Sequence, residues 1–450
     1  MSGDEAVSGD AAASAGDTGA SMRSGYHAAP SRPVWLTVVL VAAVVVFAAW
    51  FAHLFRDTAQ HVIEWYAGTG DPTAAAASLR WYVLFGLVTV TVFVAAWMGR
   101  FIERFFGNRT GVEAVAASAR GEGRNISLRA TWVRSAATWS TSVGLVSIGR
   151  ESAIIESGGA IGAIVGKRSG GRGDALATAG IAAAFAAAYH APIAGMLYVE
   201  EHLRVHTSRR ALVFASAGAA GGHAASVYLF GGHAIFPPTE GSRWRMLVLG
   251  MIALLPALLA ARLFLELRVR VKALSIADRL GVPWWAIVLP FAIVAGAAVA
   301  TFPLAAGNGM EALRQVPLGV TAGTGLALCF GKLAGTTASI GGGAPGGVLT
   351  PTISIASGAA LLTLLAVEQA GVAVDHPWDP LVLAMAVGVA VGLRSPYGAI
   401  FLLPEMLGDY TLVPVVAVVV ALAFVIDRGI DRIVVSAGER LPSGIYDEDA

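Results

Sequence analysis

The sequence predicts an all-α protein that crosses a membrane several times. Of its 450 residues, 56% are hydrophobic and only 14% are charged, with a mean hydropathy of +0.67; a soluble domain carries about 25% charged residues. Charge-free apolar runs that are long enough to span, or nearly span, a bilayer occur at residues 34–52, 81–98, 246–261 and 411–426. In addition, segments in the two halves of the chain resemble each other in sequence, which predicts two membrane repeats.

The chain is expected to divide into four parts. Residues 1–33 are rich in Ala, Gly, Ser and Asp without hydrophobic periodicity, which predicts a disordered tail. Residues 34–230 and 243–427 are the two predicted repeats. Residues 428–450 form a short C-terminal segment. The apolar run that follows the tail shows no convincing cleavage site, so it is interpreted as a membrane span and not as a signal peptide.

Basic residues predict the orientation in the membrane, because cytoplasmic loops are enriched in Lys and Arg. Seven arginines lie between residues 100 and 134, and further basic groups lie at 204–210 and 262–279. Residues 57–79 contain no Lys or Arg and should face outside. The N-terminus is therefore expected in the cytoplasm of a protein of the cell (inner) membrane. The net charge of +1 gives no indication of a nucleic-acid partner.

Two pairs of segments carry the internal repeat. "IIESGGA" (154–160) resembles "SIASGAA" (354–360), and "HAPIAGMLYVEE" (190–201) resembles "RSPYGAIFLLPE" (394–405). In the second pair a proline is followed nine residues later by a glutamate, which is Glu201 in one half and Glu405 in the other. Duplicated halves with glycine-interrupted apolar segments are typical of transporters, whose binding site lies where broken helices meet at the repeat interface.

A glycine-rich segment, "GGGAPGGVLTP" (341–351), is the predicted anion-binding element. The residues from Val348 onward look helical, so the first N–H groups have no acceptor within the helix. Helix N-termini bind anions. The segment lacks the lysine and hydroxyl pattern of a nucleotide-binding loop. Lys332, in the apolar run before it, should face a cavity or an acidic group.

A separate motif, "GRES" (149–152), places the carboxylate of Glu151 beside Arg150 in an apolar setting. Desolvation disfavours the charged carboxylate, whereas nearby helix N-termini favour it. The two effects oppose each other, so Glu151 could be poised to titrate and to couple proton movement to anion movement. The simpler interpretation is an ion pair between Glu151 and Arg150 at a helix end.

Taken together, "GRES", "HAPIAGMLYVEE", "GGGAPGGVLTP", "EMLGDYTLVP" (405–414) and "SGIY" (443–446) resemble the CLC family of chloride channels and H⁺/Cl⁻ antiporters, in the family's order and over residues 34–450. The resemblance implies two inverted-topology repeats whose broken helices meet at a central anion site. It also implies a homodimer that requires no cofactor and has no enzymatic activity. The paired cytoplasmic nucleotide-binding domains of larger members are expected to be missing.

The resemblance also implies individual roles, carried over motif by motif. Glu151 matches the external gate and Glu201 the internal proton-transfer glutamate. The anion-binding residues would be Thr110, Gly149, Arg150, Val348, Leu349 and Tyr446. The sequence departs from the family pattern in four places: Ser152 and Ala153 replace Gly-Pro after the gate, Leu349 replaces the usual phenylalanine, and Glu113 stands at a proline position. These departures leave the anion preference open.

The function that these observations favour is H⁺-coupled chloride antiport. The main alternative is a passive voltage- or proton-gated chloride channel, which would not require Glu201. Two enzyme alternatives are weaker. "ASGA" (356–359) is only loosely like the nucleophile turn of an intramembrane hydrolase. "HLRVH" (202–206) has the helical spacing of two zinc ligands, but a third ligand is not evident and no metal site is predicted.

Overall fold

The computed structural model describes residues 33–107, 111–122, 126–170, 173–204, 209–271 and 280–436, and these residues are built from helices. The first half contains α1 (Val34–Ala67), α2 (Pro72–Ser78), α3 (Trp81–Phe106), α4 (Val112–Ala119), α5 (Leu128–Val143), α6 (Glu151–Arg168), α7 (Gly173–Tyr189), α8 (Pro192–Leu197), η1 (Tyr198–His202) and α9 (Arg209–Phe230). The second half contains α10 (Arg243–Arg270), α12 (Trp284–Thr301), η2 (Pro303–Ala305), α13 (Met310–Gln315), η3 (Val316–Leu318), α14 (Ala322–Leu326), η4 (Ala327–Gly331), α15 (Lys332–Gly341), α16 (Leu349–Gln369), α17 (Trp378–Leu393), α18 (Pro396–Leu407), η5 (Tyr410–Leu412) and α19 (Val413–Ser436).

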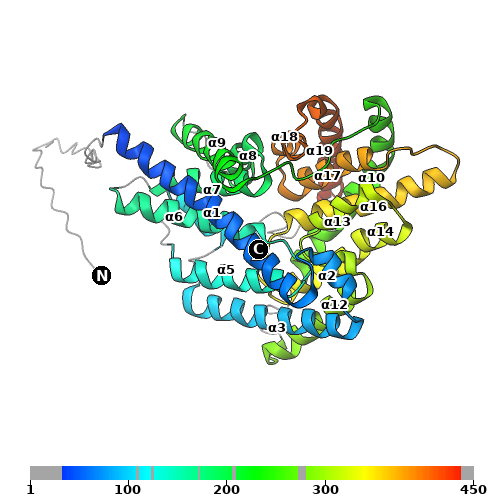
Figure 1. Cartoon of the computed structure of the whole chain (residues 1–450), viewed down its shortest axis with the longest axis horizontal. Coiled ribbons are helices and arrows are strands. Elements are labelled where there is room, and N and C mark those ends of the chain that lie inside the picture. The colour runs from blue at the N-terminus through cyan, green and yellow to red at the C-terminus, as the bar shows by residue number, and fades with distance from the viewer. Residues whose placement is uncertain are drawn as a thin grey trace, which may run out of the picture.

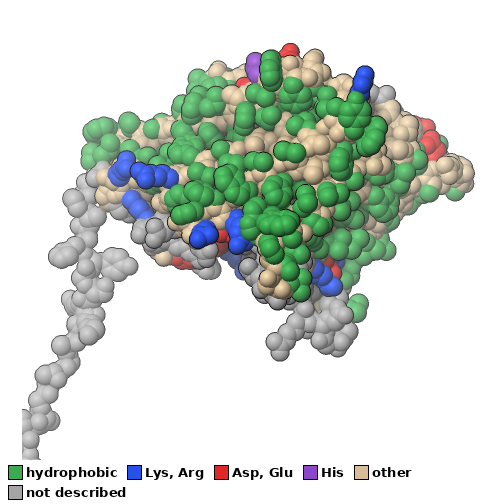
Figure 2. All heavy atoms as spheres, turned by 90° about the horizontal axis from the view of Figure 1, so that it is seen from below, with side chains coloured by type: hydrophobic (Ala, Val, Ile, Leu, Met, Phe, Trp, Pro, Cys, Tyr) green, Lys and Arg blue, Asp and Glu red, His purple; other side chains and the backbone are tan. Residues whose placement is uncertain are grey.

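Seven helical segments of the described chain are long and apolar enough to cross a bilayer: α1 with α2, α3, α9, α10, α12, α16, and η5 with α19. They contain all four apolar runs that the sequence predicts as spans. The tryptophans Trp35, Trp81 and Trp244 are exposed near helix ends, where amphipathic rings suit a membrane–water interface. Figure 2 shows a face largely covered by hydrophobic side chains. The protein is therefore an integral, multi-pass membrane protein.

Small residues allow the helices of the first half to approach closely. Helix α7 packs between α6 and α9, and α1 lies across all three (Figure 1). At the α6–α7 contact, a Cβ atom on Gly158 would lie 2.5 Å from the carbonyl oxygen of Gly180, and one on Gly180 would lie 2.2 Å from that of Gly158. The two backbones therefore touch, which is the packing that small residues permit between membrane helices.

The internal repeat has a counterpart in the backbone. His190 and Arg394, the first residues of the two matching segments, both adopt a left-handed conformation, with φ of 56° and 47°. Each is followed two residues later by a proline that begins a helix, Pro192 for α8 and Pro396 for α18. The fixed φ of proline suits a first helical position. The two helices pack against each other, so the segments that resemble each other in sequence also meet in space.

Candidate anion site

Two broken helices begin at one point inside the protein. The segment before α6 and the segment before α16 run past each other at Gly149 and Gly347. The Gly149 N–H donates to the Gly347 carbonyl at 2.9 Å, and the Gly347 N–H donates back at 2.8 Å. A Cβ atom at Gly149 would lie 2.4 Å from the Gly347 oxygen. This close contact fixes the N-termini of α6 and α16 beside each other, as the broken-helix prediction requires.

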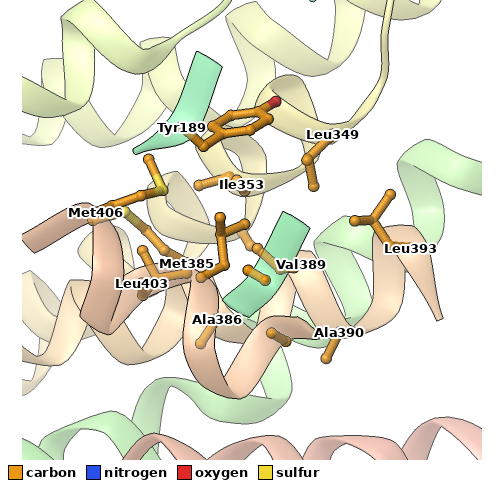
Figure 3. Packing of buried hydrophobic residues seen from close by; sticks show 14 of the residues in the cluster. Tyr189, Leu349, Ile353, Met385, Ala386, Val389, Ala390, Leu393, Leu403 and Met406 are labelled. Atoms are coloured by element: carbon orange, nitrogen blue, oxygen red, sulfur yellow. The ribbon is translucent and has the colours of Figure 1, made fainter. Parts of the chain in front are cut away.

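The first turn of α16 has backbone N–H groups that no described residue accepts. Val348 is the residue that precedes the helix and Leu349 is its first residue, and both are buried. Within the described part of the chain, their N–H groups donate no hydrogen bond. Figure 3 shows the buried Leu349 and Ile353 of α16 in one cluster with Tyr189, the last residue of α7. Unpaired N–H groups at a helix N-terminus are suited to binding a negative charge.

Glu151, the first residue of α6, lies between these elements and is nearly fully buried. Its Oε2 accepts hydrogen bonds from the Arg150 backbone N–H at 3.0 Å and from the Thr350 hydroxyl at 3.1 Å. Its Oε1 accepts from the Asn308 side-chain amide at 2.6 Å. Since Thr350 belongs to α16, the carboxylate is held at the N-termini of both broken helices.

Other charged groups surround the carboxylate. The Arg150 guanidinium donates to Glu311 Oε1 at 2.8 Å and lies 4.0 Å from Glu151 Oε1. Lys332 is 0% exposed, and its ammonium group donates to the carbonyl oxygens of Ala305 (at 3.1 Å) and Gly307. Two cations and two carboxylates thus share one buried region. Such pairing is what buried charges require, because an isolated buried charge is very costly.

Glu201 lies in a different place, at the end of the α8–η1 segment. Its carboxylate accepts hydrogen bonds from the Gly398 N–H at 2.8 Å, the Tyr397 N–H at 3.3 Å and the Ser395 hydroxyl. These donors belong to the start of α18 and the residue before it. In this structure Glu201 therefore caps the N-terminus of a helix from the other half of the chain.

The family of the chain follows from a comparison of its sequence with family models. Residues 91–428 match the model described as the voltage-gated chloride channel. The chain belongs to the CLC family. Its members are transport proteins and not enzymes. No curated protein matches the sequence.

The CLC fold is also found in three similar solved structures. A slow cyanobacterial Cl⁻/H⁺ antiporter has a TM-score of 0.72 and 21% identity, covering 92% of this chain and 97% of that chain. A CLC-type fluoride/proton antiporter has a TM-score of 0.68 and 20% identity, covering 88% and 96%. A eukaryotic CLC transporter has a TM-score of 0.65 and 16% identity, covering 92% and 74%. At these identities the likeness establishes the fold alone.

The structure brings some of the predicted CLC site residues together and does not describe others. Glu151, Arg150, Gly149, Val348 and Leu349 lie at the crossing of the two broken helices. The backbone N–H groups of Gly149 and Arg150 donate to Gly347 and Glu151, so in this structure these two N–H groups do not face an anion. Thr110 and Tyr446 lie outside the described residues, as does His206 of the histidine pair.

Three residues of the site were not predicted: Asn308, Glu311 and Thr350. Thr350 lies inside the glycine-rich motif, but its hydroxyl was not assigned a role. Asn308 and Glu311 follow η2 in a segment with no recognisable motif, and only the flanking glycines of "GNG" (307–309) indicate a tight turn. Lys332 was expected to face a cavity or an acid; it contacts backbone carbonyls within the same charged region.

Proposed function

We propose that this protein exchanges chloride for protons across the membrane, with Glu151 as the gate of the anion pathway. The observation that carries the proposal is the position of the Glu151 carboxylate at the N-termini of α6 and α16, where the N–H groups of Val348 and Leu349 find no acceptor among the described residues. A negatively charged carboxylate occupies the place that suits an anion.

The exchange follows from the chemistry of that position. While ionised, Glu151 accepts hydrogen bonds and blocks the pathway as a tethered anion. Protonation removes its charge, weakens its attraction to the helix N-termini and lets the side chain leave. A chloride ion then takes its place, stabilised by the same helix N-termini. When the carboxyl loses its proton it returns and displaces the anion, so one side chain links the two movements.

The proposed proton route uses Glu201 on the cytoplasmic side, as the CLC resemblance implies. A passive channel is the second candidate, and one observation favours it. The Glu201 carboxylate accepts three hydrogen bonds at the start of α18, which is a structural role that a channel could keep without moving protons. The names of two similar structures, a Cl⁻/H⁺ and a fluoride/proton antiporter, support exchange.

We also propose a homodimer in the cell membrane, with the N-terminus in the cytoplasm. The transported anion is proposed to be chloride, with Val348, Leu349, Thr110 and Tyr446 as its ligands. Leu349 replaces the phenylalanine usual in the family, so fluoride and nitrate should be compared with chloride.

The test is transport by the purified protein in liposomes, with anion release and internal pH recorded together. An imposed chloride gradient should drive protons uphill, in the opposite direction to chloride. Chloride movement without proton movement would refute antiport and support the passive channel. The absence of any anion flux would refute both.

A further inference from the structure

The segment between η2 and α13, residues 306–309, is fixed against the gate from the second half of the chain. The Ile148 N–H donates to the Gly307 carbonyl at 3.1 Å, which ties this segment to the segment that leads into α6. Lys332 donates to the same carbonyl. Gly309 has a φ of 100°, and a Cβ atom there would lie 2.8 Å from Ser354. The segment thus has little freedom to move away from Glu151.

Asn308 is oriented by its own hydrogen bonds. The residue is 3% exposed. Its Oδ1 accepts the Met310 N–H at 3.0 Å, so the amide nitrogen must face the other way, toward Glu151 Oε1 at 2.6 Å. An amide nitrogen carries only donors. The side chain therefore offers Glu151 a hydrogen-bond donor in a fixed direction.

The partners of Glu151 suit the ionised carboxylate. Asn308 Nδ2 contacts one oxygen, and the Arg150 backbone N–H and the Thr350 hydroxyl contact the other. The hydroxyl can donate or accept a hydrogen bond, whereas the two N–H groups can only donate. A proton on either oxygen would have to point away from these donors. A hydrogen bond from a buried amide to a charged carboxylate is among the stronger kinds, so it stabilises the ionised, closed position.

We propose that Asn308 is a positioning residue that latches the ionised Glu151 carboxylate in the closed position and so sets the pH at which the pathway opens. The inference rests on the proposed role of Glu151 as the gate. The two proposals differ in what they require. The gate requires only the Glu151 carboxylate, whereas the latch also requires a hydrogen-bond donor from the 306–309 segment in the second half of the chain. Because the Asn308 amide binds the ionised carboxylate more strongly than the protonated carboxyl group, losing it should let protonation open the pathway at higher pH.

Other charged groups also act on Glu151 and must be held constant. Arg150 and Glu311 form an ion pair beside it, and Lys332 donates to the Gly307 carbonyl of the 306–309 segment. Arg56 of α1 interacts electrostatically with Arg150 and with Arg314 of α13. Farther along α6, Glu156 pairs with Arg134 of α5 at 3.3 Å. The test therefore changes Asn308 and leaves all of these groups in place.

The experiment measures chloride flux against pH in liposomes for the wild type, Asn308→Ala and Asn308→Asp. Removing the donor should raise the pH of half-maximal flux by about one unit. Asn308→Asp keeps the acceptor for the Met310 N–H but replaces the donor by a carboxylate, so it should raise that pH at least as much. It also provides a second variant if Asn308→Ala fails to fold.

Ser147→Ala is the matched control, because it removes a buried hydroxyl that contacts Thr336 and not the gate. It should leave the pH of half-maximal flux unchanged.

The same substitutions in a Glu151→Gln background decide between the latch and a general effect. If Asn308 acts through the carboxylate, Asn308→Ala should change nothing further in that background. If Glu151→Gln abolishes the pH dependence but Asn308→Ala in the wild-type background leaves the profile unshifted, the latch is refuted and the gate stands. An equal effect of Asn308→Ala in both backgrounds would refute the latch too. If Glu151→Gln retains the wild-type pH dependence, the gate itself fails, and the latch fails with it.

Discussion

Glu201 and Glu405 each cap the N-terminus of a helix from the other half of the chain: Glu201 caps α18, which carries Glu405, and Glu405 caps α8, which directly precedes the η1 segment of Glu201. Glu405, on α18, accepts hydrogen bonds from the Ile193 and Ala194 N–H groups of α8, both at 2.9 Å. Glu201, which follows α8, accepts from the Tyr397 and Gly398 N–H groups of α18. Each carboxylate satisfies backbone donors that lack an acceptor within the helix and lies at the positive end of the helix dipole. The reciprocal contact joins the two halves of the chain.

This relationship provides a matched pair for testing Glu201. Both Glu201→Gln and Glu405→Gln weaken a charged cap, so each should lower the free energy of unfolding by about 1 kcal/mol. Only Glu201→Gln should also block the proposed proton route, because glutamine cannot ionise. We expect chloride flux with little or no proton movement from Glu201→Gln and normal coupling from Glu405→Gln. Simultaneous chloride and pH recording on liposomes measures both.

Because Glu201 also caps α18, two other results would each exclude a proton-transfer role. Uphill proton transport by Glu201→Gln at the wild-type rate would leave Glu201 as a cap alone. Equal loss of coupling in both variants would assign the effect to the α8–α18 contact and not to proton transfer.

The close crossing of the segments before α6 and α16 predicts that Gly149 and Gly347 differ in how well they tolerate substitution by alanine. In Gly149→Ala the new methyl group would lie 2.4 Å from the Gly347 carbonyl oxygen, and the backbone must separate. In Gly347→Ala the nearest atom would be the Ser152 nitrogen at 3.4 Å, an ordinary contact. We expect Gly149→Ala to lose anion flux at least tenfold or to fail to fold, and Gly347→Ala to retain both flux and thermal stability. Equal tolerance of the two substitutions would contradict the close crossing.

Glu151→Gln should keep anion flux but remove its dependence on pH, since a neutral side chain cannot close the pathway as an anion. Glu156→Gln is the control: Glu156 is a fully buried acid on the same helix, but it pairs with Arg134. The control should keep the pH dependence, with a loss of stability of about 3 kcal/mol from the broken ion pair. An unaltered pH profile in Glu151→Gln would remove Glu151 from the gate.

The elements that the sequence predicted well are those with local causes. Apolar runs predicted spans, and the glycine-rich segment before Leu349 predicted the start of a helix whose first N–H groups have no acceptor within the helix. Asn308 could not be predicted in this way. It contacts Glu151 across 157 residues of sequence, and no local sequence pattern indicates which loop the fold places against Glu151. The capping by Glu201 was missed for the same reason, although the repeat aligned it with Glu405.

The role of Tyr446 as a ligand of the anion stays a prediction, because the residue lies outside the described part of the chain. Tyr446→Phe removes a hydroxyl donor and should weaken chloride binding about threefold to tenfold, the effect of one hydrogen bond. Tyr228→Phe, at a highly exposed position on α9, is the control and should bind chloride normally. Calorimetric titration of the purified variants with chloride measures the affinity. Unchanged binding in Tyr446→Phe would exclude its hydroxyl from the site.

Lys332 should tune the gate through charge, because it belongs to the same buried region as Glu151, Glu311 and Arg150. Lys332→Met leaves one cation facing two carboxylates, and the excess negative charge favours protonation of a carboxyl group. The pH of half-maximal flux should therefore rise, by about one unit for a single buried charge. Lys332→Arg retains the cation and should shift this pH far less. A rise of equal size in both variants would mean that packing around Ala305 and Gly307, and not charge, sets the pH response.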